Sequence, residues 1–119
     1  MEKLATIDIG TNTALLLIAE IVPENKTLRA LHNQIEVVRL GKGVDKDRRI
    51  TQDAVRRLIA AITNFKSAIA AHGGAKTLAV ATSAMRDAEN RADVIQAVMA
   101  QTGIQIEILN GEEEADMTF

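Results

Sequence analysis

Two apolar segments joined by a short polar turn open the chain, and they restrict its fold more than any other feature. Residues 4–9 have the pattern of a β-strand, and residues 14–22 form an apolar run of strand length. Because the connection at 10–13 is too short for a helical crossover, the two strands should be antiparallel neighbours. This excludes the plain β-α-β start of a dinucleotide-binding unit. An apolar run such as 14–22 is also typical of a strand that is buried on both faces.

The rest of the chain alternates between predicted strands and helices. A short turn leads to a third strand, 27–40, which completes an antiparallel meander. Thr51 and Asn90 are each expected to cap a helix, because their side chains can accept a hydrogen bond from a free N–H group there. Gly73 and Gly103 are expected to end these helices. The remaining predicted elements are a strand at 77–82, a strand at 104–109 and a helix start at 111–115.

The resulting order is β-β-β-α-β-α-β, followed by the start of a helix. It predicts an α/β fold with a mixed five-stranded sheet and flanking helices, the layout of a ribonuclease-H-like half-domain. No repeat or linker interrupts the 119 residues, whose length suits one domain. We therefore interpret residues 1–119 as a single domain.

The amino-acid composition limits which partners and which catalytic groups the chain can use. A formal net charge of −2 and only two aromatic residues argue against nucleic acid as a partner. The sequence shows neither an apolar segment long enough to span a membrane nor a signal peptide, so no membrane partner is expected. Cysteine is absent, which fits a cytoplasmic protein, and His32 and His72 are far apart in the sequence. A metal site built from Cys or His is therefore not expected. Catalysis should rest on carboxylates, hydroxyls, backbone amides and a bound cation.

The turn between the first two strands carries the first candidate residues. Gly10 allows close approach of the backbone to a ligand, and the polar groups of Thr11, Asn12 and Thr13 can surround a phosphate. Asp8, at the strand end, can hold Mg²⁺ directly or through water. The alternative is an ordinary hairpin turn with Asn12 in the left-handed conformation. These residues alone leave both interpretations open.

The second group of candidates follows the fourth strand. Thr82 and Ser83 offer hydroxyl groups, and the planar guanidinium of Arg86 suits bidentate binding of phosphate. Ligands of α/β sheets bind at such strand ends. By itself, however, this segment favours a structural interpretation, in which Thr82 or Ser83 caps a helix and Arg86 pairs with Asp87 or Glu89.

Three consecutive glutamates, Glu112, Glu113 and Glu114, begin the last predicted helix. The helix dipole stabilises acidic residues in a first turn, so capping is the default explanation. The dipole also favours the ionised carboxylate. A functional glutamate at this place would therefore act as a base or orient a water molecule.

Taken together, four segments resemble the exopolyphosphatase / guanosine pentaphosphatase (Ppx/GppA) phosphatase family, in an order and spacing that extend over nearly the whole chain. The resemblance implies a fold of the actin-like ATPase superfamily with two halves and an active site in the cleft between them. It also implies release of a terminal phosphate from a linear phosphate chain, with Mg²⁺ or another divalent cation. The segments are IDIGTNT (7–13), RLGKGVD (39–45), ATSAMRDAEN (81–90) and IEILNGEEEA (106–115).

The resemblance also implies roles for individual residues. Asp8 would lie beside the metal, and Glu114, the last glutamate before alanine in the G-E-E-E-A segment, would be catalytic. Glu112 and Glu113 would remain capping residues. The implied phosphate-binding residues are Gly10, Thr11, Asn12, Thr13, Ser83 and Arg86.

Two departures from the family pattern stand out. Asn110 occupies a position where many relatives have serine, and a second phosphate loop of the D-I-G-G-G-S-T-E type is missing before Phe119. The chain is therefore interpreted as the N-terminal domain of a longer enzyme with at least two domains, which lacks its C-terminal half here. A homodimer of that parent is left open.

The expected function is Mg²⁺-dependent release of terminal orthophosphate from inorganic polyphosphate by the parent, with the 119-residue part inactive alone. Hydrolysis of the 5′-terminal phosphate of guanosine pentaphosphate is the alternative, because the same residues serve both. An actin-like kinase half that needs ATP and a non-catalytic nucleotide-binding module are two further alternatives. The G-E-E-E-A segment argues against the kinase.

Overall fold

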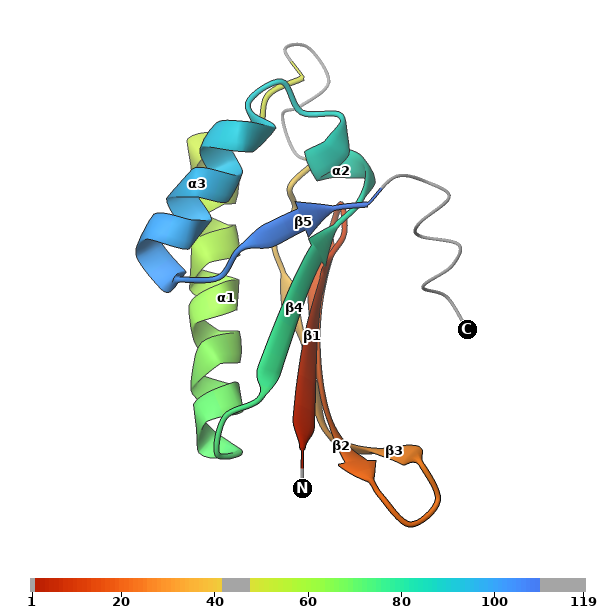
Figure 1. The fold of residues 1–119 in the computed structure, drawn as a ribbon. Helices are drawn as coiled ribbons and strands as arrows, with labels where there is room; N and C mark the ends of the chain where they lie inside the picture. Colours follow the sequence, from red (N-terminus) through yellow and green to blue (C-terminus); the bar gives the residue numbers. More distant parts are fainter. Residues whose placement is uncertain (1, 42–47, 110–119) are drawn as a thin grey trace.

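Five strands form a single sheet in the computed structural model, which describes residues 2–41 and 48–109. β1 (Lys3–Ile9), β2 (Thr13–Val22) and β3 (Thr27–Val37) form an antiparallel meander. β4 (Lys76–Ala81) pairs in parallel with β1, and β5 (Ile106–Ile108) pairs in parallel with β4. The strand order across the sheet is therefore β3-β2-β1-β4-β5 (Figure 1).

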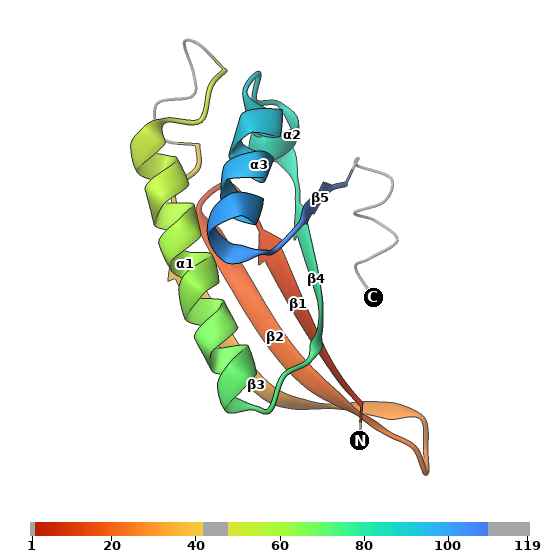
Figure 2. The ribbon, with the colours of Figure 1, turned by 60° about the vertical axis from the view of Figure 1, so that its left-hand side comes forward.

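Within residues 2–41 and 48–109, three helices accompany the sheet: α1 (Gln52–Ala71), α2 (Ser83–Arg86) and α3 (Arg91–Thr102). Both views show α1 and α3 on the same side of the sheet, while α2 follows the end of β4 (Figures 1 and 2). The predicted order of strands and long helices is confirmed, with α2 as an addition. No helix in the described ranges has the length and hydrophobicity needed to cross a lipid bilayer.

The ends of α1 follow the sequence prediction. The Thr51 hydroxyl accepts a hydrogen bond from the N–H group of Ala54 at 3.2 Å, which satisfies one donor of the first turn. After the helix, Gly73 has a φ of +87°, a left-handed conformation that glycine adopts without steric cost. Local residue types therefore determine where this helix begins and ends.

Asn90 departs from the prediction. It occupies the position before α3, but its side chain makes no capping bond to that helix. Instead its amide binds the main chain of Ile50 on both sides. Oδ1 accepts from the Ile50 N–H group at 2.9 Å, and Nδ2 donates to the Ile50 carbonyl at 3.0 Å. Asn90 thus fastens the segment that leads into α1 to the start of α3.

The predicted third strand, 27–40, also ends earlier than expected, at Val37. The N–H groups of Val38 and Arg39 both donate to the Asn12 carbonyl, each at 2.9 Å. These two residues therefore bind the turn between β1 and β2 instead of extending the ladder between β2 and β3.

The hydrophobic core lies between the helices and one face of the sheet. Ile7, Leu16 and Ile18 point from the strands into this core, where Phe65 of α1 is fully buried. The expectation that 14–22 is buried on both faces is wrong for the described part of the chain. Leu15 and Leu17 point to the other face and remain 38% and 37% exposed, because no element among residues 2–41 and 48–109 covers it.

Several predictions fall on residues outside the described ranges. These are the helix start at 111–115, the catalytic Glu114 with its neighbours Glu112 and Glu113, and residues 42–45 of the R-L-G-K-G-V-D segment.

Candidate functional site

The parallel pairing of β1 and β4 brings two candidate segments to one edge of the sheet. Ile9, at the end of β1, stands opposite Ala81, at the end of β4. The N–H group of Thr82 continues this pairing and donates to the Ile9 carbonyl at 3.2 Å. The turn after β1 and the segment after β4 therefore leave the sheet side by side. Ligands of α/β proteins bind at this carboxyl edge.

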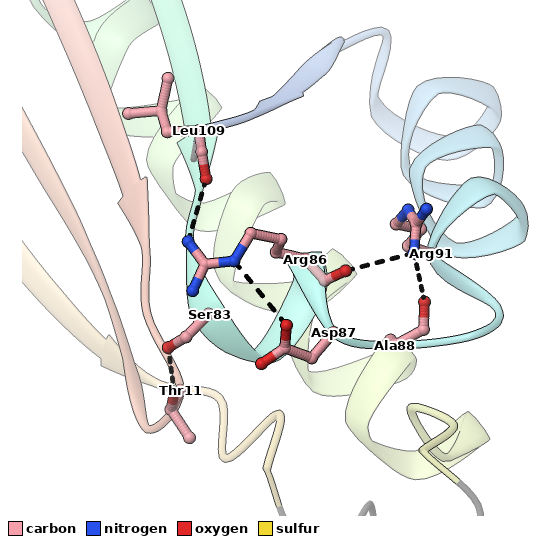
Figure 3. A network of polar contacts seen from close by, with 7 residues as sticks. All are labelled: Thr11, Ser83, Arg86, Asp87, Ala88, Arg91 and Leu109. Atoms are coloured by element: carbon pink, nitrogen blue, oxygen red, sulfur yellow. Dashed lines mark hydrogen bonds and ion pairs between the residues drawn. The ribbon is translucent and has the colours of Figure 1, made fainter. Parts of the chain in front are cut away.

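Thr11 and Ser83 join these two segments directly. Thr11 Oγ1 and Ser83 Oγ are 3.4 Å apart and share a hydrogen bond, although the residues are 72 positions apart in the sequence (Figure 3). Both side chains are exposed. Two hydroxyl groups from different segments thus lie at one place on the surface.

The turn from Gly10 to Thr13 is closed by a main-chain hydrogen bond, in which the Gly10 N–H group donates to the Thr13 carbonyl at 2.9 Å. A side chain on Gly10 would place Cβ only 3.3 Å from that oxygen, so the turn fits glycine closely. The alternative with a left-handed Asn12 is wrong in that detail: among the described residues other than glycine, positive φ values occur at Lys26, Arg39 and Arg48. The turn is a hairpin connection between β1 and β2 without a left-handed Asn12.

Asp8 lies on the face of the sheet that faces away from α1 and α3. Its neighbours Ile7 and Ile9 are buried on the helix side, and side chains alternate along a strand. In the register of the sheet Asp8 stands between Leu15 of β2 and Val80 of β4. The carboxylate is exposed and lies one residue before the end of β1.

Arg86 ends α2, and its guanidinium reaches towards the end of β5. Nη1 donates to the Leu109 carbonyl at 3.3 Å, and Nε lies 3.7 Å from Asp87 Oδ1 (Figure 3). The predicted pairing with Asp87 therefore exists, but the hydroxyl of Thr82 makes no capping bond to α2. The Arg86 side chain is 34% exposed. Because partly exposed ion pairs contribute little energy, the contact with Asp87 does not prevent Arg86 from binding an anion.

Two residues that support the turn were missed by the sequence analysis. The sequence does not single out Arg57 of α1, yet its Nε donates to the Val38 carbonyl at 2.8 Å and its Nη2 to the Arg39 carbonyl at 3.1 Å. Gly41 follows, and its N–H group donates to the Thr11 carbonyl at 3.2 Å. No local pattern marks these contacts, because they join segments far apart in the chain.

A hollow of about 690 Å³ lies between the N-terminal parts of α1 and α3, with Arg49, Arg56 and Asp93 among its lining residues. None of the predicted site residues lines it. The candidate site is instead an exposed surface at the carboxyl edge of the sheet.

Comparisons with known proteins identify the family of the chain. The sequence model described as the Ppx/GppA phosphatase family matches residues 17–119. The chain belongs to the Ppx/GppA phosphatase family. Exopolyphosphatase 1 of Mycobacterium tuberculosis is 34% identical over 98% of the chain. The matched part is 34% of that relative, so the chain spans about a third of the length of this curated protein.

Solved structures of the Ppx/GppA family have the same fold. An exopolyphosphatase from Cytophaga hutchinsonii superposes with a TM-score of 0.91 at 32% identity, over 98% of this chain and 36% of that one. The Aquifex aeolicus family member superposes with a TM-score of 0.89 at 27% identity, over 95% of this chain and 36% of that one. The ribonuclease-H-like fold predicted from the element order is thereby confirmed, as is the actin-like fold that the family resemblance implies.

Replacing Gly41 by alanine should destabilise the chain through Thr11. The new Cβ would lie 2.7 Å from Thr11 Cγ2, so either Thr11 rotates away from Ser83 or the 38–41 segment moves. We expect a loss of about 1–3 kcal/mol in the free energy of unfolding, measured by urea denaturation of the 119-residue chain.

The double variant Gly41→Ala/Thr11→Ser provides the matched control, because serine keeps the hydroxyl and lacks Cγ2. It should recover most of the lost stability, while Thr11→Ser alone should change it little. A double variant as unstable as Gly41→Ala alone would contradict the proposed clash.

Proposed function

We propose that this chain is the N-terminal domain of a longer exopolyphosphatase, a hydrolase that releases terminal orthophosphate from inorganic polyphosphate. The observation that carries this proposal is the contact between Thr11 and Ser83, since it unites two donor-rich segments at the carboxyl edge of the sheet. The absence of cysteine in the chain fits a reducing cytoplasm, which we propose as the place of action.

The donor groups at this edge suit the end of a phosphate chain. Hydroxyl, amide and N–H groups of the turn can bind phosphate oxygens, and Arg86 adds a positive charge from the neighbouring segment. We assign phosphate binding to these residues because both segments leave the sheet at its carboxyl edge, where Thr11 contacts Ser83. They are Gly10, Thr11, Asn12, Thr13, Ser83 and Arg86.

Asp8 is the residue that would hold Mg²⁺ or another divalent cation. In the described part of the chain, no three Asp, Glu, His or Cys side chains gather into a metal-binding group. The single carboxylate of Asp8 still fits Mg²⁺, because this ion is commonly held by one or two carboxylates together with substrate phosphates and water. Such a cation would neutralise charge on the phosphate chain.

Glu114 supplies the general base in this mechanism. It orients the attacking water and accepts a proton from it as the water oxygen bonds to the terminal phosphorus. The phosphoanhydride P–O bond breaks, and the shortened chain leaves. The described chain ends close to the other groups: the Leu109 N–H group donates to the Ala81 carbonyl at 2.9 Å, and the Leu109 carbonyl accepts from Arg86. Leu109, the last described residue before Glu114, therefore lies at the same edge.

The proposed site needs further groups from the rest of the parent protein to enclose the phosphate. Thr11, Asn12, Thr13 and Ser83 are all exposed, so water competes for every contact that they make with phosphate. Preorganised donors stabilise a phosphoryl transition state best where water is excluded. We therefore expect the C-terminal part of the parent to close over this edge, and the 119-residue chain alone to be inactive.

Substrate choice tests the proposal in the full-length parent. With Mg²⁺ present, kcat/KM for medium-length polyphosphate should exceed that for guanosine pentaphosphate by at least about tenfold, which corresponds to about 1.4 kcal/mol. Chelation of the cation should abolish both activities. A preference for guanosine pentaphosphate would support the sister activity instead, and nucleotide binding without phosphate release would indicate a binding module.

Arg86→Ala in the parent should weaken binding of polyphosphate. A charged, hydrogen-bonded contact contributes about 1.5–3 kcal/mol, so KM should rise about ten- to a hundredfold. Arg56→Ala is the matched control, because Arg56 lies on the exposed surface of α1 and pairs with Asp53. Equal KM values for the two variants would assign Arg86 to a purely structural role.

Glu114→Gln in the parent should keep substrate binding and lose most turnover. Glutamine preserves the shape of the side chain but cannot accept a proton, and loss of a general base costs about 10²–10⁴-fold in kcat. Glu113→Gln serves as the neighbouring control and should retain most activity. Similar losses in both variants, or a greater loss in Glu113→Gln, would refute the assignment.

A further inference from the structure

The two histidines of the chain lie far apart in the sequence but meet in the structure. The ring centroids of His32, in β3, and His72, at the end of α1, are 5.4 Å apart, and the rings are tilted by 45°. Both residues are partly exposed. Distance along the sequence, the reason for expecting no histidine metal site, therefore does not describe how close the two rings are.

Main-chain hydrogen bonds fix where each histidine stands. His32 is the register partner of Ile18, a buried residue of β2, so its side chain lies on the helix-covered face of the sheet. The His72 N–H group donates to the Ile69 carbonyl at 3.1 Å, and the His72 carbonyl accepts from Lys3 Nζ. Both imidazoles therefore project from a main chain that is already ordered, which reduces the entropy lost when they bind one ion together.

A hydrogen bond to Gln34 selects the tautomer of neutral His32. His32 Nε2 is 2.9 Å from Gln34 Oε1, and an amide oxygen can only accept a hydrogen bond. Nε2 therefore carries the proton, which leaves the lone pair of the neutral ring on Nδ1. Metal-binding histidines have this arrangement, in which one ring nitrogen donates to a protein oxygen and the other binds the ion.

The separation of the two rings suits one ion between them. Zn²⁺ binds histidine nitrogen at about 2.0–2.1 Å in tetrahedral geometry, and adding the radius of each ring gives a centroid separation of about 5 Å. The observed 5.4 Å is close to this spacing. Imidazole suits Zn²⁺, Cu²⁺ and Ni²⁺, whereas Mg²⁺ prefers oxygen ligands. The pair therefore selects a different class of cation from the one proposed beside Asp8.

We propose that His32 and His72 together bind one transition-metal ion of the Zn²⁺ class at the junction of β3 and the end of α1. No third His, Cys, Asp or Glu side chain joins them within residues 2–41 and 48–109, so water completes the coordination. The bound ion ties the edge strand β3 to the long helix and stabilises the folded chain by mass action.

The proposed ion site is separate from the candidate phosphate site. His32 is aligned through Ile18 with Ala5, near the start of β1, whereas the phosphate-binding turn follows the end of β1. The two sites therefore lie towards opposite ends of the sheet, and the proposal does not depend on the substrate assignment.

Chemical modification of histidine in the full-length protein tests the proposal. Diethyl pyrocarbonate modifies the unprotonated nitrogen of imidazole, and peptide mapping by mass spectrometry reports His32 and His72 separately from any other histidine. Because both residues are partly exposed, they should react in the absence of metal. Zn²⁺ at about 1 mM should slow both reactions at least about tenfold, which corresponds to a Kd of about 0.1 mM or tighter. Mg²⁺ at the same concentration should leave both rates unchanged.

His72→Asn distinguishes an ion held by both rings from two independent contacts. A single imidazole lacks the gain of a second linked ligand, so His32 of this variant should lose its protection by Zn²⁺. His32→Asn provides the reciprocal measurement on His72, and the comparison of Zn²⁺ with Mg²⁺ needs no variant. Slowing by Zn²⁺ of less than about tenfold, equal protection by Mg²⁺, or protection of His32 that survives His72→Asn would overturn the proposal.

Discussion

The parallel hydrogen bonding between β1 and β4 is the interaction on which the candidate site depends. It aligns Ile9 with Ala81, so that the segments after both strands leave the sheet at one edge. A parallel pair needs a long crossover, and α1 provides it between the meander and β4. The buried side chains of α1, with Phe65 at their centre, hold this crossover against the sheet. The α1 crossover therefore both builds the hydrophobic core and brings the two segments of the candidate site together.

Much of this arrangement could be predicted from the sequence, because it is encoded locally. Apolar runs of strand length, the helical spacing before Gly73 and the Thr51 cap each depend on neighbouring residues, and the structure agrees with them. The role of Asn90 was predicted wrongly and the role of Arg57 was not predicted, because their partners are distant in the sequence. Their partners lie 40 positions away, at Ile50, and 18 and 19 positions away, at Arg39 and Val38. Residue type alone cannot tell a helix cap or a solvated charge from a bond to a distant main chain.

In the candidate site, too, the residue types could be predicted from the sequence but the long-range contacts could not. Asp8 and the Gly10–Thr13 turn could be singled out from their residue types, but the meeting of Thr11 with Ser83 follows only from the sheet register. The role of Glu114 came from the family resemblance and remains a prediction. Burial of 14–22 on both faces was predicted from a pattern suited to the whole protein, whereas the described part covers one face.

The sheet face that carries Leu15, Leu17 and Leu78 is exposed in the described part of the chain, and this has a consequence during synthesis. A ribosome releases the N-terminal residues first and adds about 5–20 residues per second, so β1 to β5 emerge before anything encoded downstream. During that interval Leu17, Leu78 and their neighbours face water. Nascent chains on neighbouring ribosomes expose the same apolar side chains. Exposed apolar side chains of this kind favour association with other polypeptides until the later part of the chain has been made. Selection on these strands thus acts on the nascent chain as well as on the finished enzyme.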